Sequence, residues 1–457
     1  MEILSDGNGG AQVAALRQRR QKLIAALAGA PALIQAGVAP PRNYPANQYD
    51  FRASSHFLYL VGLPLAGAAL LLEACQGQGQ GQGQGRSHLF VPPPADDDAL
   101  WHGELPSMAA LQAATGVDAV HPLPELAGWL ARVGQPGRLP AVAEGERTAA
   151  DARLIETIID LRLCHDAAAV HELRRAVEVT VRAHAAGRRA TRPGVRISAV
   201  RAAMEAEMLA ADFTPAYPSI VTTRGEVLHS HDRSGVCEAG ELLLADVGAE
   251  SDTGWASDVT RTWPVSGRFS ASQRVMYELV LQAQLAAIAA VKPGASYRRV
   301  HLTAARVLCA GLRDEGILVG EVDGLLDRGA HGLFFPHGVG HLIGLDVHDM
   351  EDLGDRAGYA PGRQRSQQFG LCYLRLDRDL QPGMCVTIEP GLYLVPAILR
   401  NEALTGPLRD ALRLDKLDRF ADVRGIRIED DVLVTETGCE VLTAAIPKAT
   451  SEIEQPA

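Results

Sequence analysis

Two aspartates, Asp246 and Asp258, stand at the ends of apolar segments in the second half of the chain. Leu242–Ala245 and Trp255–Pro264 have the composition of two strands of a hairpin. If the turn is centred on Asp252, the two aspartates face each other with Cβ atoms about 4.5–5.5 Å apart. Buried carboxylates at that distance repel each other unless a cation neutralises them. The pair therefore predicts metal ligands; the alternatives are two solvated aspartates or a calcium loop, and the spacing of an EF-hand is absent.

Three histidines, His337, His341 and His348, follow within a single glycine-containing segment, Phe334 to Asp349. Glycine lets the backbone approach a bound ligand closely. Histidine nitrogen is a common neutral metal ligand and the usual acid–base group near neutral pH. One histidine in such a segment would more often be a packed or surface residue, but three together predict a metal or acid–base site.

Two glutamates lie at further strand ends. Glu389 is followed by Pro390, which cannot donate to a β-ladder and so ends the strand. Glu429 shares a strand face with Arg427, because side chains alternate with a period of two. Either glutamate alone would be ordinary polarity at a strand end.

As a set, these residues predict a two-metal hydrolytic site. The predicted ligands are four carboxylates and one imidazole: Asp246, Asp258, His341, Glu389 and Glu429. Two divalent ions cancel four negative charges, and a bridging hydroxide completes the site. Two such ions about 3.5–4 Å apart generate a nucleophile and stabilise an oxyanion. Oxygen-rich ligation favours Mn²⁺ over a thiolate-type zinc site.

A sequence repeat predicts how the ligands are positioned. Thr191–Val200 and Val291–Val300 each contain a Pro-Gly turn between two helical segments. Gly240–Gly248 and Gly383–Gly391 follow in the same order, and each places a carboxylate six residues after its first glycine. Two copies with a long period indicate a duplicated unit rather than a solenoid. The repeat predicts a pseudo-twofold domain with one carboxylate from each half near the axis.

The region before residue 165 has a different pattern of apolar and polar residues. Short apolar segments alternate with helical stretches, which predicts strands at Pro31–Gly37, Phe57–Val61, Ala68–Leu72 and Leu89–Val91. The Gln-Gly alternation from Gln76 to Gly85 cannot bury a core and predicts a loop between two strands. A long helix is expected from Asp166 onward, so the domain boundary is placed near residue 165.

Composition limits the class of protein. The net charge of −11 is a poor match for a nucleic-acid backbone. Seven cysteines without a C-x-x-C pair favour reduced thiols and a cytoplasmic location. The apolar stretch Leu23–Val38 is interrupted by Gly29, Pro31 and Gln35, so a helix and a strand are expected there rather than a signal peptide. The sequence has no run of 18 or more apolar residues, and no membrane partner is expected.

The motifs resemble those of the Xaa-Pro aminopeptidases (aminopeptidase P) and prolidases, within the creatinase and methionine-aminopeptidase superfamily. The matching segments are Leu244-Ala-Asp-Val-Gly248, Ser257-Asp-Val-Thr-Arg-Thr-Trp-Pro264, His337-Gly-Val-Gly-His341, Leu345-Asp-Val-His-Asp349, Thr387-Ile-Glu-Pro-Gly-Leu-Tyr393, Gly425-Ile-Arg-Ile-Glu-Asp430 and, near the start, Asp50–Gly62. The resemblance covers nearly the whole chain. It implies an α+β protein: a creatinase-type α/β N-terminal domain at residues 1–165 and a pseudo-twofold pita-bread catalytic domain at residues 166–457.

The resemblance also implies roles. The five predicted ligands would hold two divalent ions, most often Mn²⁺, and Glu389 would be the general base. His229 and His348 would contact the substrate and stabilise the tetrahedral intermediate. His337 would line the pocket, and Arg427 would orient a ligand carboxylate. The expected reaction is removal of the first residue from peptides with proline at the second position, in a homodimer or homotetramer.

Two positions depart from the family pattern. The family usually places its two aspartates one residue closer together than Asp246 and Asp258. An insertion in the turn Ser251–Gly254 would be tolerated, whereas one within a strand would turn an aspartate away. His56 stands where an acidic residue is common, which bears on how a substrate amine is held.

Alternative functions remain open from the sequence. A strict Xaa-Pro dipeptidase could use Arg375 to bind the dipeptide carboxylate; a surface salt bridge is an equal alternative for this residue. The segments Pro396–Asp422 and Leu442–Glu454 also resemble those of prolidases. A methionine aminopeptidase usually lacks the first domain, and creatinase-type amidinohydrolases lack the metals. A catalytically inactive binding module would be expected to have lost some ligands.

Overall fold

The computed structural model describes residues 9–73, 85–142, 145–230 and 232–455. The chain divides into two compact units, Met1–Ala168 and Ala169–Ala457. The division falls just after the start of helix α7 (Ala167–Ala190), and the sequence places the boundary three residues earlier, after residue 165. Among the described residues, no helix has the length and apolar character needed to cross a bilayer.

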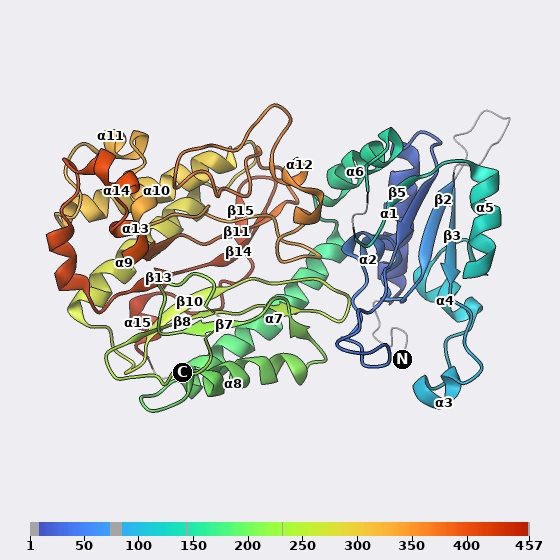
Figure 1. Cartoon of the computed structure of the whole chain (residues 1–457), viewed down its shortest axis with the longest axis horizontal. Helices are drawn as coiled ribbons and strands as arrows, with labels where there is room; N and C mark the ends of the chain where they lie inside the picture. Colours follow the sequence, from blue (N-terminus) through green and yellow to red (C-terminus); the bar gives the residue numbers. More distant parts are fainter. Residues whose placement is uncertain (1–8, 74–84, 143–144, 231, 456–457) are drawn as a thin grey trace. The chain divides into compact units, whose positions relative to one another are not determined.

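The first unit is built on a five-stranded mixed sheet with the order β4-β3-β2-β1-β5. Its strands are β1 (Ala32–Gln35), β2 (Ala69–Glu73), β3 (Arg86–Val91), β4 (Ala119–Pro122) and β5 (Gly137–Leu139). Its helices are α1 (Gly9–Ala26), α2 (Ser55–Val61), α3 (Asp98–His102), α4 (Met108–Thr115), α5 (Leu126–Val133) and α6 (Ala149–Arg162), as Figure 1 shows. Apolar residues of α5 pack on one face of the sheet, where Leu33, Leu71 and Phe90 are buried. The predicted Gln-Gly loop lies outside the described residues, between β2 and β3.

One predicted strand of this unit is wrong, because Phe57–Val61 belongs to helix α2. The Ser54 hydroxyl accepts a hydrogen bond from the Phe57 backbone N–H, and Gly62 ends the helix in the left-handed conformation at φ 77°. All residues of α2 are buried, so its sequence shows no polar face. Periodicity cannot distinguish a short buried helix from a buried strand, whereas the flanking serine and glycine are capping residues.

The second unit contains two three-stranded sheets, ordered β10-β8-β7 and β11-β14-β15, and two smaller pairs, β12-β13 and β6-β9. The strands are β6 (Thr214–Pro215), β7 (Ile220–Thr222), β8 (Leu242–Asp246), β9 (Ala249–Glu250), β10 (Thr260–Pro264), β11 (Cys385–Ile388), β12 (Gly391–Tyr393), β13 (Gly425–Arg427), β14 (Asp430–Val434) and β15 (Cys439–Val441). The helices after α7 are α8 (Ile197–Leu209), α9 (Ala271–Ala290), α10 (Tyr297–Asp314), α11 (Val322–Asp327), α12 (Asp355–Gly358), α13 (Pro396–Leu399), α14 (Glu402–Thr405) and α15 (Thr450–Ile453).

The two halves of this unit repeat the same backbone arrangement. The Gly194 N–H donates to the Cys237 carbonyl at 2.9 Å, and Gly294, 100 residues later, donates to the Leu380 carbonyl at 2.8 Å. Both glycines have a positive φ, 85° and 77°, which favours glycine after the proline. Each turn joins two long helices, α7 to α8 and α9 to α10. The duplication predicted from the sequence is therefore present in the structure.

Candidate metal centre

Breaks between short strands position the two glutamates. Glu389 lies between β11 and β12, and Glu429 lies between β13 and β14. Strand β11 pairs with β14, and β12 pairs with β13, so both glutamates stand at the same interruption of the ladder. Their backbone N–H groups are satisfied elsewhere, by the carbonyls of Val339 at 2.8 Å and Thr260 at 3.0 Å. Pro390 cannot donate to a ladder, which explains why regular pairing stops here.

The predicted register of the aspartate hairpin is wrong by two residues. Asp246, at the end of β8, pairs with Thr260 rather than with Asp258. The turn is centred on Thr253, because the Ser251 N–H donates to the Trp255 carbonyl at 2.8 Å. The Ser251 hydroxyl also accepts from the Trp255 N–H at 3.1 Å, a contact that sequence spacing does not reveal.

Asp258 nevertheless lines the same cavity as Asp246. A shift of two residues keeps every side chain on its original face, whereas a shift of one would reverse it. The two aspartates are therefore diagonal rather than directly opposed neighbours, a relation in which long side chains still meet. Gly248 makes this possible, since a Cβ at this position would lie 1.8 Å from the Ser257 carbonyl oxygen.

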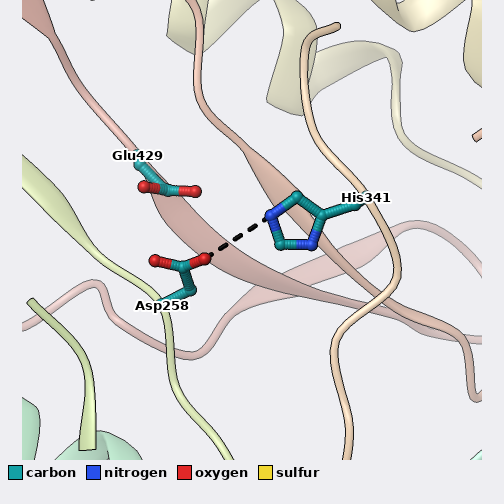
Figure 2. Close-up of side chains that lie close together, drawn as sticks. All are labelled: Asp258, His341 and Glu429. Carbon is teal, nitrogen blue, oxygen red and sulfur yellow. Dashed lines mark ion pairs between the residues drawn. The ribbon is translucent and has the colours of Figure 1, made fainter. Parts of the chain in front are cut away.

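Asp258, His341 and Glu429 form a compact group of potential metal ligands, drawn in Figure 2. One donor atom from each lies within 4.8 Å of the others. His341 Nε2 is 3.4 Å from Asp258 Oδ2 and 3.8 Å from Glu389 Oε1. On the other side of the ring, Nδ1 lies 3.0 Å from the Leu342 carbonyl and donates to it. This bond orients the ring so that Nε2 points toward the carboxylates, and a hydrogen bond from the second ring nitrogen is the usual arrangement of a metal-binding histidine.

The electrostatics of the cluster fit divalent cations. Burial, with only partial compensation by His341 and Arg427, raises the pKa of Glu389 to about 7. Burial and the neighbouring carboxylates raise the pKa of Glu429 well above its usual value. Burial also raises the pKa of Asp246, and its buried Oδ1 has no hydrogen-bond partner among the described residues. Buried carboxylates without enough positive charge are the donor set that hard divalent ions prefer.

His341 and Asp258 differ from the other members of the cluster. Burial alone would lower the pKa of His341, but its contact with Asp258 raises the pKa to about 8. Burial alone would raise the pKa of Asp258, but the same contact lowers it. His341 thus stabilises the charged form of Asp258, whereas the raised pKa values of Asp246, Glu389 and Glu429 show that nearby positive charge only partly compensates these three carboxylates.

Arg427 connects the ligands to the surrounding hydrogen-bond network. Its Nη2 donates to Asp246 Oδ2 at 2.6 Å, and its Nη1 donates to the Tyr393 hydroxyl at 3.1 Å. The Tyr393 hydroxyl lies 2.8 Å from His337 Nε2. Burial lowers the pKa of His337 to about 3, so this ring is neutral at physiological pH. The chain of contacts fixes the orientation of Asp246 and of the His337 ring together.

Three residues of this network have no role predicted from the sequence. The Tyr217 hydroxyl donates to Asp258 Oδ1 at 2.6 Å. The Thr260 hydroxyl donates to Glu429 Oε2 at 2.6 Å, and Tyr393 contacts both Arg427 and His337. Thr260 and Tyr393 lie inside the quoted motifs, which was a usable signal. Tyr217 stands in an unremarkable segment, and only the tertiary fold brings it to the site.

All nine predicted site residues line one cavity of about 660 Å³. They are Asp246, Asp258, His341, Glu389, Glu429, His229, His337, His348 and Arg427. The rings of His341 and His348 lie 4.3 Å apart, measured between centroids. Arg375 lines the same cavity and is ion-paired with Glu351, so it is both a wall of the site and part of a salt bridge. The structure thus gathers ligands and candidate substrate contacts from both halves of the repeat.

His56, which departs from the family pattern, is a buried residue of α2 in the first unit. Its Nδ1 lies 2.8 Å from Nη1 of Arg162, which is also buried. The described contacts of this histidine are therefore those of a packed core residue within its own unit.

Two family models match the chain. Residues 171–436 match metallopeptidase family M24, and residues 16–138 match the N-terminal domain of aminopeptidase P. These ranges correspond to the α+β organisation described above, with a creatinase-type first domain and a pita-bread second domain.

Curated relatives and solved structures agree with these matches. The chain is 30% identical to a human Xaa-Pro dipeptidase, over 96% of this chain and 91% of that protein. It is 31% identical to Xaa-Pro aminopeptidase 2 of Streptomyces coelicolor, over 95% of this chain and 89% of that protein. The structure of the Pseudomonas aeruginosa aminopeptidase PepP superposes with a TM-score of 0.77 at 31% identity, covering 97% of each chain.

Proposed function

The chain belongs to metallopeptidase family M24 and is a metallo-exopeptidase, and we propose that it is a Xaa-Pro aminopeptidase. It would release the first residue of a peptide whose second residue is proline. One observation carries the proposal: four carboxylates, each at most 16% exposed, and one buried histidine converge in a cavity that further histidines and arginines also line. The likeness to aminopeptidase P over both units supports the same activity.

We propose that two divalent ions are held by Asp246, Asp258, His341, Glu389 and Glu429. When bound, the ions would supply a nucleophilic hydroxide and stabilise negative charge on the carbonyl oxygen. Mn²⁺ is the proposed ion, because four of the five ligands are carboxylates.

The other roles belong to the side chains around this centre. Glu389 is the proposed general base, because its carboxylate lies within the ligand cluster, 3.8 Å from His341 Nε2, where it can accept a proton and return it to the leaving proline nitrogen. Arg427 holds Asp246 in orientation through its 2.6 Å bond. His348 and His229 would donate to the substrate carbonyl as charge develops there. His337, held by Tyr393, would form a neutral wall beside the proline ring.

The chemistry of the peptide bond explains the expected specificity. The proline nitrogen of the scissile bond carries no hydrogen, and the proline ring fixes φ near −65°. A neutral histidine side chain can pack against the proline ring. Because the proline nitrogen has no hydrogen, no N–H of the substrate is left buried and unpaired there. The free amine of the first residue would lie near the carboxylate cluster, where positive charge is favoured. Cleavage would therefore stop after one residue.

A Xaa-Pro dipeptidase is the second candidate, since the human relative bears that name and Arg375 lines the cavity.

We further propose that the enzyme works in the cytoplasm as a homodimer or homotetramer, without nucleic-acid or membrane partners. The six described cysteines form no disulfide, and the net charge of −11 disfavours a polyanion.

A peptide series tests the proposal. The purified protein is assayed with Xaa-Pro, Xaa-Pro-Yaa and longer peptides, with and without Mn²⁺. We expect metal-dependent release of the first residue from the tripeptide and longer substrates. Turnover confined to dipeptides would favour the dipeptidase, and no turnover with any of several divalent ions would refute both.

The variant Glu389→Ala tests the assigned base in the same assay. Loss of a general base typically costs about 10²–10⁴-fold in rate, and loss of a metal ligand adds to this. We expect turnover to fall by at least about 10³-fold, while circular dichroism and the melting temperature show a folded protein. Near-normal turnover would refute the role of Glu389.

A further inference from the structure

Three arginines line the cavity, and a carboxylate already binds each of them. Arg427 pairs with Asp246 inside the site. Nearer the exposed part of the cavity wall, Arg375 pairs with Glu351, and Arg365 pairs with Asp355. Among the described residues, the cavity thus presents no guanidinium group whose charge is left unpaired. An incoming carboxylate would have to compete with a protein carboxylate for any of these arginines.

The Arg375–Glu351 pair is the one best placed to meet substrate. Nη1 of Arg375 donates to both oxygens of Glu351, at 2.8 and 2.6 Å. Oε2 of Glu351 also lies 3.3 Å from Nδ1 of His348, a proposed substrate contact. Burial alone would raise the pKa of Glu351, but His348 and Arg375 lower it to about 2, so the carboxylate is charged. The side chains are 36% and 39% exposed, so a substrate can reach them.

We propose that Glu351 determines the length of substrate that this enzyme prefers, by neutralising Arg375 and so disfavouring dipeptides with a free carboxylate after proline. The inference rests on the proposed Xaa-Pro activity and adds a substrate class to it: tripeptides and longer chains. Glu351 acts through Arg375 and His348 and is a positioning residue rather than a catalytic one.

Dipeptide and longer substrates differ in the position of their carboxylate. In a Xaa-Pro dipeptide the carboxylate follows the proline directly, within about one Cα spacing, ~3.8 Å, of the scissile bond. Glu351 occupies Nη1 of Arg375, so that carboxylate must either displace Glu351 or bind Arg375 through another N–H group beside it, and in both cases it meets the negative charge of Glu351. In a longer peptide the same position is a neutral amide, which neither needs Arg375 nor repels Glu351.

The expected size of the effect is moderate. Exposed ion pairs contribute little, and the repulsion between two partly exposed carboxylates is screened by water and salt. We therefore expect Glu351 to change discrimination between dipeptide and tripeptide by roughly tenfold rather than by several orders of magnitude.

The test compares wild type with Glu351→Gln, assayed with a Xaa-Pro dipeptide and the matching Xaa-Pro-Yaa tripeptide in saturating Mn²⁺. In the variant, we expect KM for the dipeptide to fall roughly tenfold with little change in kcat. Any general effect through His348 would alter kcat for both peptides, so the ratio of the two kcat/KM values isolates the proposed role. Glu351→Ala, which keeps no hydrogen-bonding group, should shift the ratio in the same direction.

Two further variants control for charge and for the partner. Asp355→Asn removes the same charge from the same cavity beside Arg365, and it should leave the dipeptide-to-tripeptide ratio close to that of wild type. Glu351→Gln combined with Arg375→Gln should lose the gain in dipeptide binding, because no arginine is released.

The outcomes separate this inference from the proposed function. If wild type cleaves Xaa-Pro-Yaa but the ratio is unchanged in Glu351→Gln and Glu351→Ala, the role of Glu351 is refuted and the aminopeptidase stands. An equal shift in Asp355→Asn would also refute it, since general electrostatics would then explain the effect. Absence of Xaa-Pro cleavage by wild type would refute the proposed function itself.

Discussion

Glu429 and Asp430 are adjacent in the chain, and their carboxylates have opposite environments. Asp430 accepts from Arg261 Nη2 at 2.7 Å, from Thr443 at 2.7 Å and from Lys448 at 2.5 Å. Glu429 accepts from the Thr260 hydroxyl at 2.6 Å and lines the cavity together with the other four proposed ligands. Neighbouring residues in extended backbone point to opposite sides, so one strand carries both environments.

The difference distinguishes a buried carboxylate that stabilises the fold from one that is available to bind a metal ion. Burial alone would raise the pKa of Asp430, but Arg261 and Lys448 hold it below the usual range. The pKa of Glu429 is instead raised well above its usual value by burial and by Asp258 and Glu389. Protein cations satisfy the first group, and the second group lacks an equivalent partner. Under the proposed function, a bound metal ion would supply the missing charge.

The largest expected effect contrasts conservative substitutions of these neighbours. Asp430→Asn leaves Arg261 and Lys448 buried without a counter-charge and should lower the free energy of unfolding by about 3 kcal/mol. Glu429→Gln removes a repelling charge, so without metal it should be at least as stable as wild type. Urea unfolding with and without EDTA measures both. Similar losses of stability in both metal-free variants would contradict the distinction.

A smaller effect is expected when Glu429 keeps its charge but loses its hydrogen bond. Thr260→Val removes the hydroxyl that donates to Glu429 at 2.6 Å and accepts from Arg427 at 2.9 Å. Loss of such a supporting contact typically weakens metal binding about 10–100-fold. Calorimetric titration with Mn²⁺ should show this loss. Unchanged affinity would mean that the hydroxyl does not orient the ligand.

The smallest expected effect concerns a buried group that lies outside the carboxylate cluster. His331 is fully buried, and burial lowers its pKa to about 4. Its pKa in the unfolded chain is about 6.5, so between these values the unfolded state binds more protons. Stability from the neutral ring is complete above about pH 6.5 and is lost as the pH falls toward 4, by at most about 1.4 kcal/mol per pH unit.

The variant His331→Leu removes this proton-binding site. The free energy of unfolding, measured in urea between pH 7 and pH 4.5, should depend less steeply on pH than in wild type. The two slopes should differ by about 1 kcal/mol per pH unit in the middle of that window. Equal slopes would show that protonation of His331 is not linked to unfolding.

The convergence of the five proposed ligands on one cavity and the presence of the repeat could be predicted because their signals are local. Each glutamate is marked by a proline or an arginine within two residues, and each half of the repeat by a Pro-Gly turn. The hairpin register was wrong because the Ser251 side chain shifts the turn to Thr253, a contact between residues four apart. An error of two residues in the register leaves Asp246 and Asp258 on the same face, so both aspartates still line one cavity, as predicted.

Residues that act through tertiary contacts could not be predicted in this way. Tyr217 reaches Asp258 across 41 positions, and Arg375 reaches Glu351 across 24. The helix that contains Phe57–Val61 is the opposite case, because its signal is local. Ser54 and Gly62 are capping residues, but the apolar sequence between them shows no polar face and so predicts a strand. The most reliable predictions therefore came from residues whose backbone conformation is itself restricted.

The number of divalent ions bound per chain distinguishes a two-metal site from a cavity that holds no metal. The metal-free protein is titrated with Mn²⁺ by calorimetry, and the metal content after gel filtration is measured by mass spectrometry. We expect two ions per chain in wild type, fewer in His341→Ala, and a melting temperature that rises with Mn²⁺ concentration. A folded wild-type chain that binds no ion, or that binds equally well after His341→Ala, would contradict the proposed two-metal site.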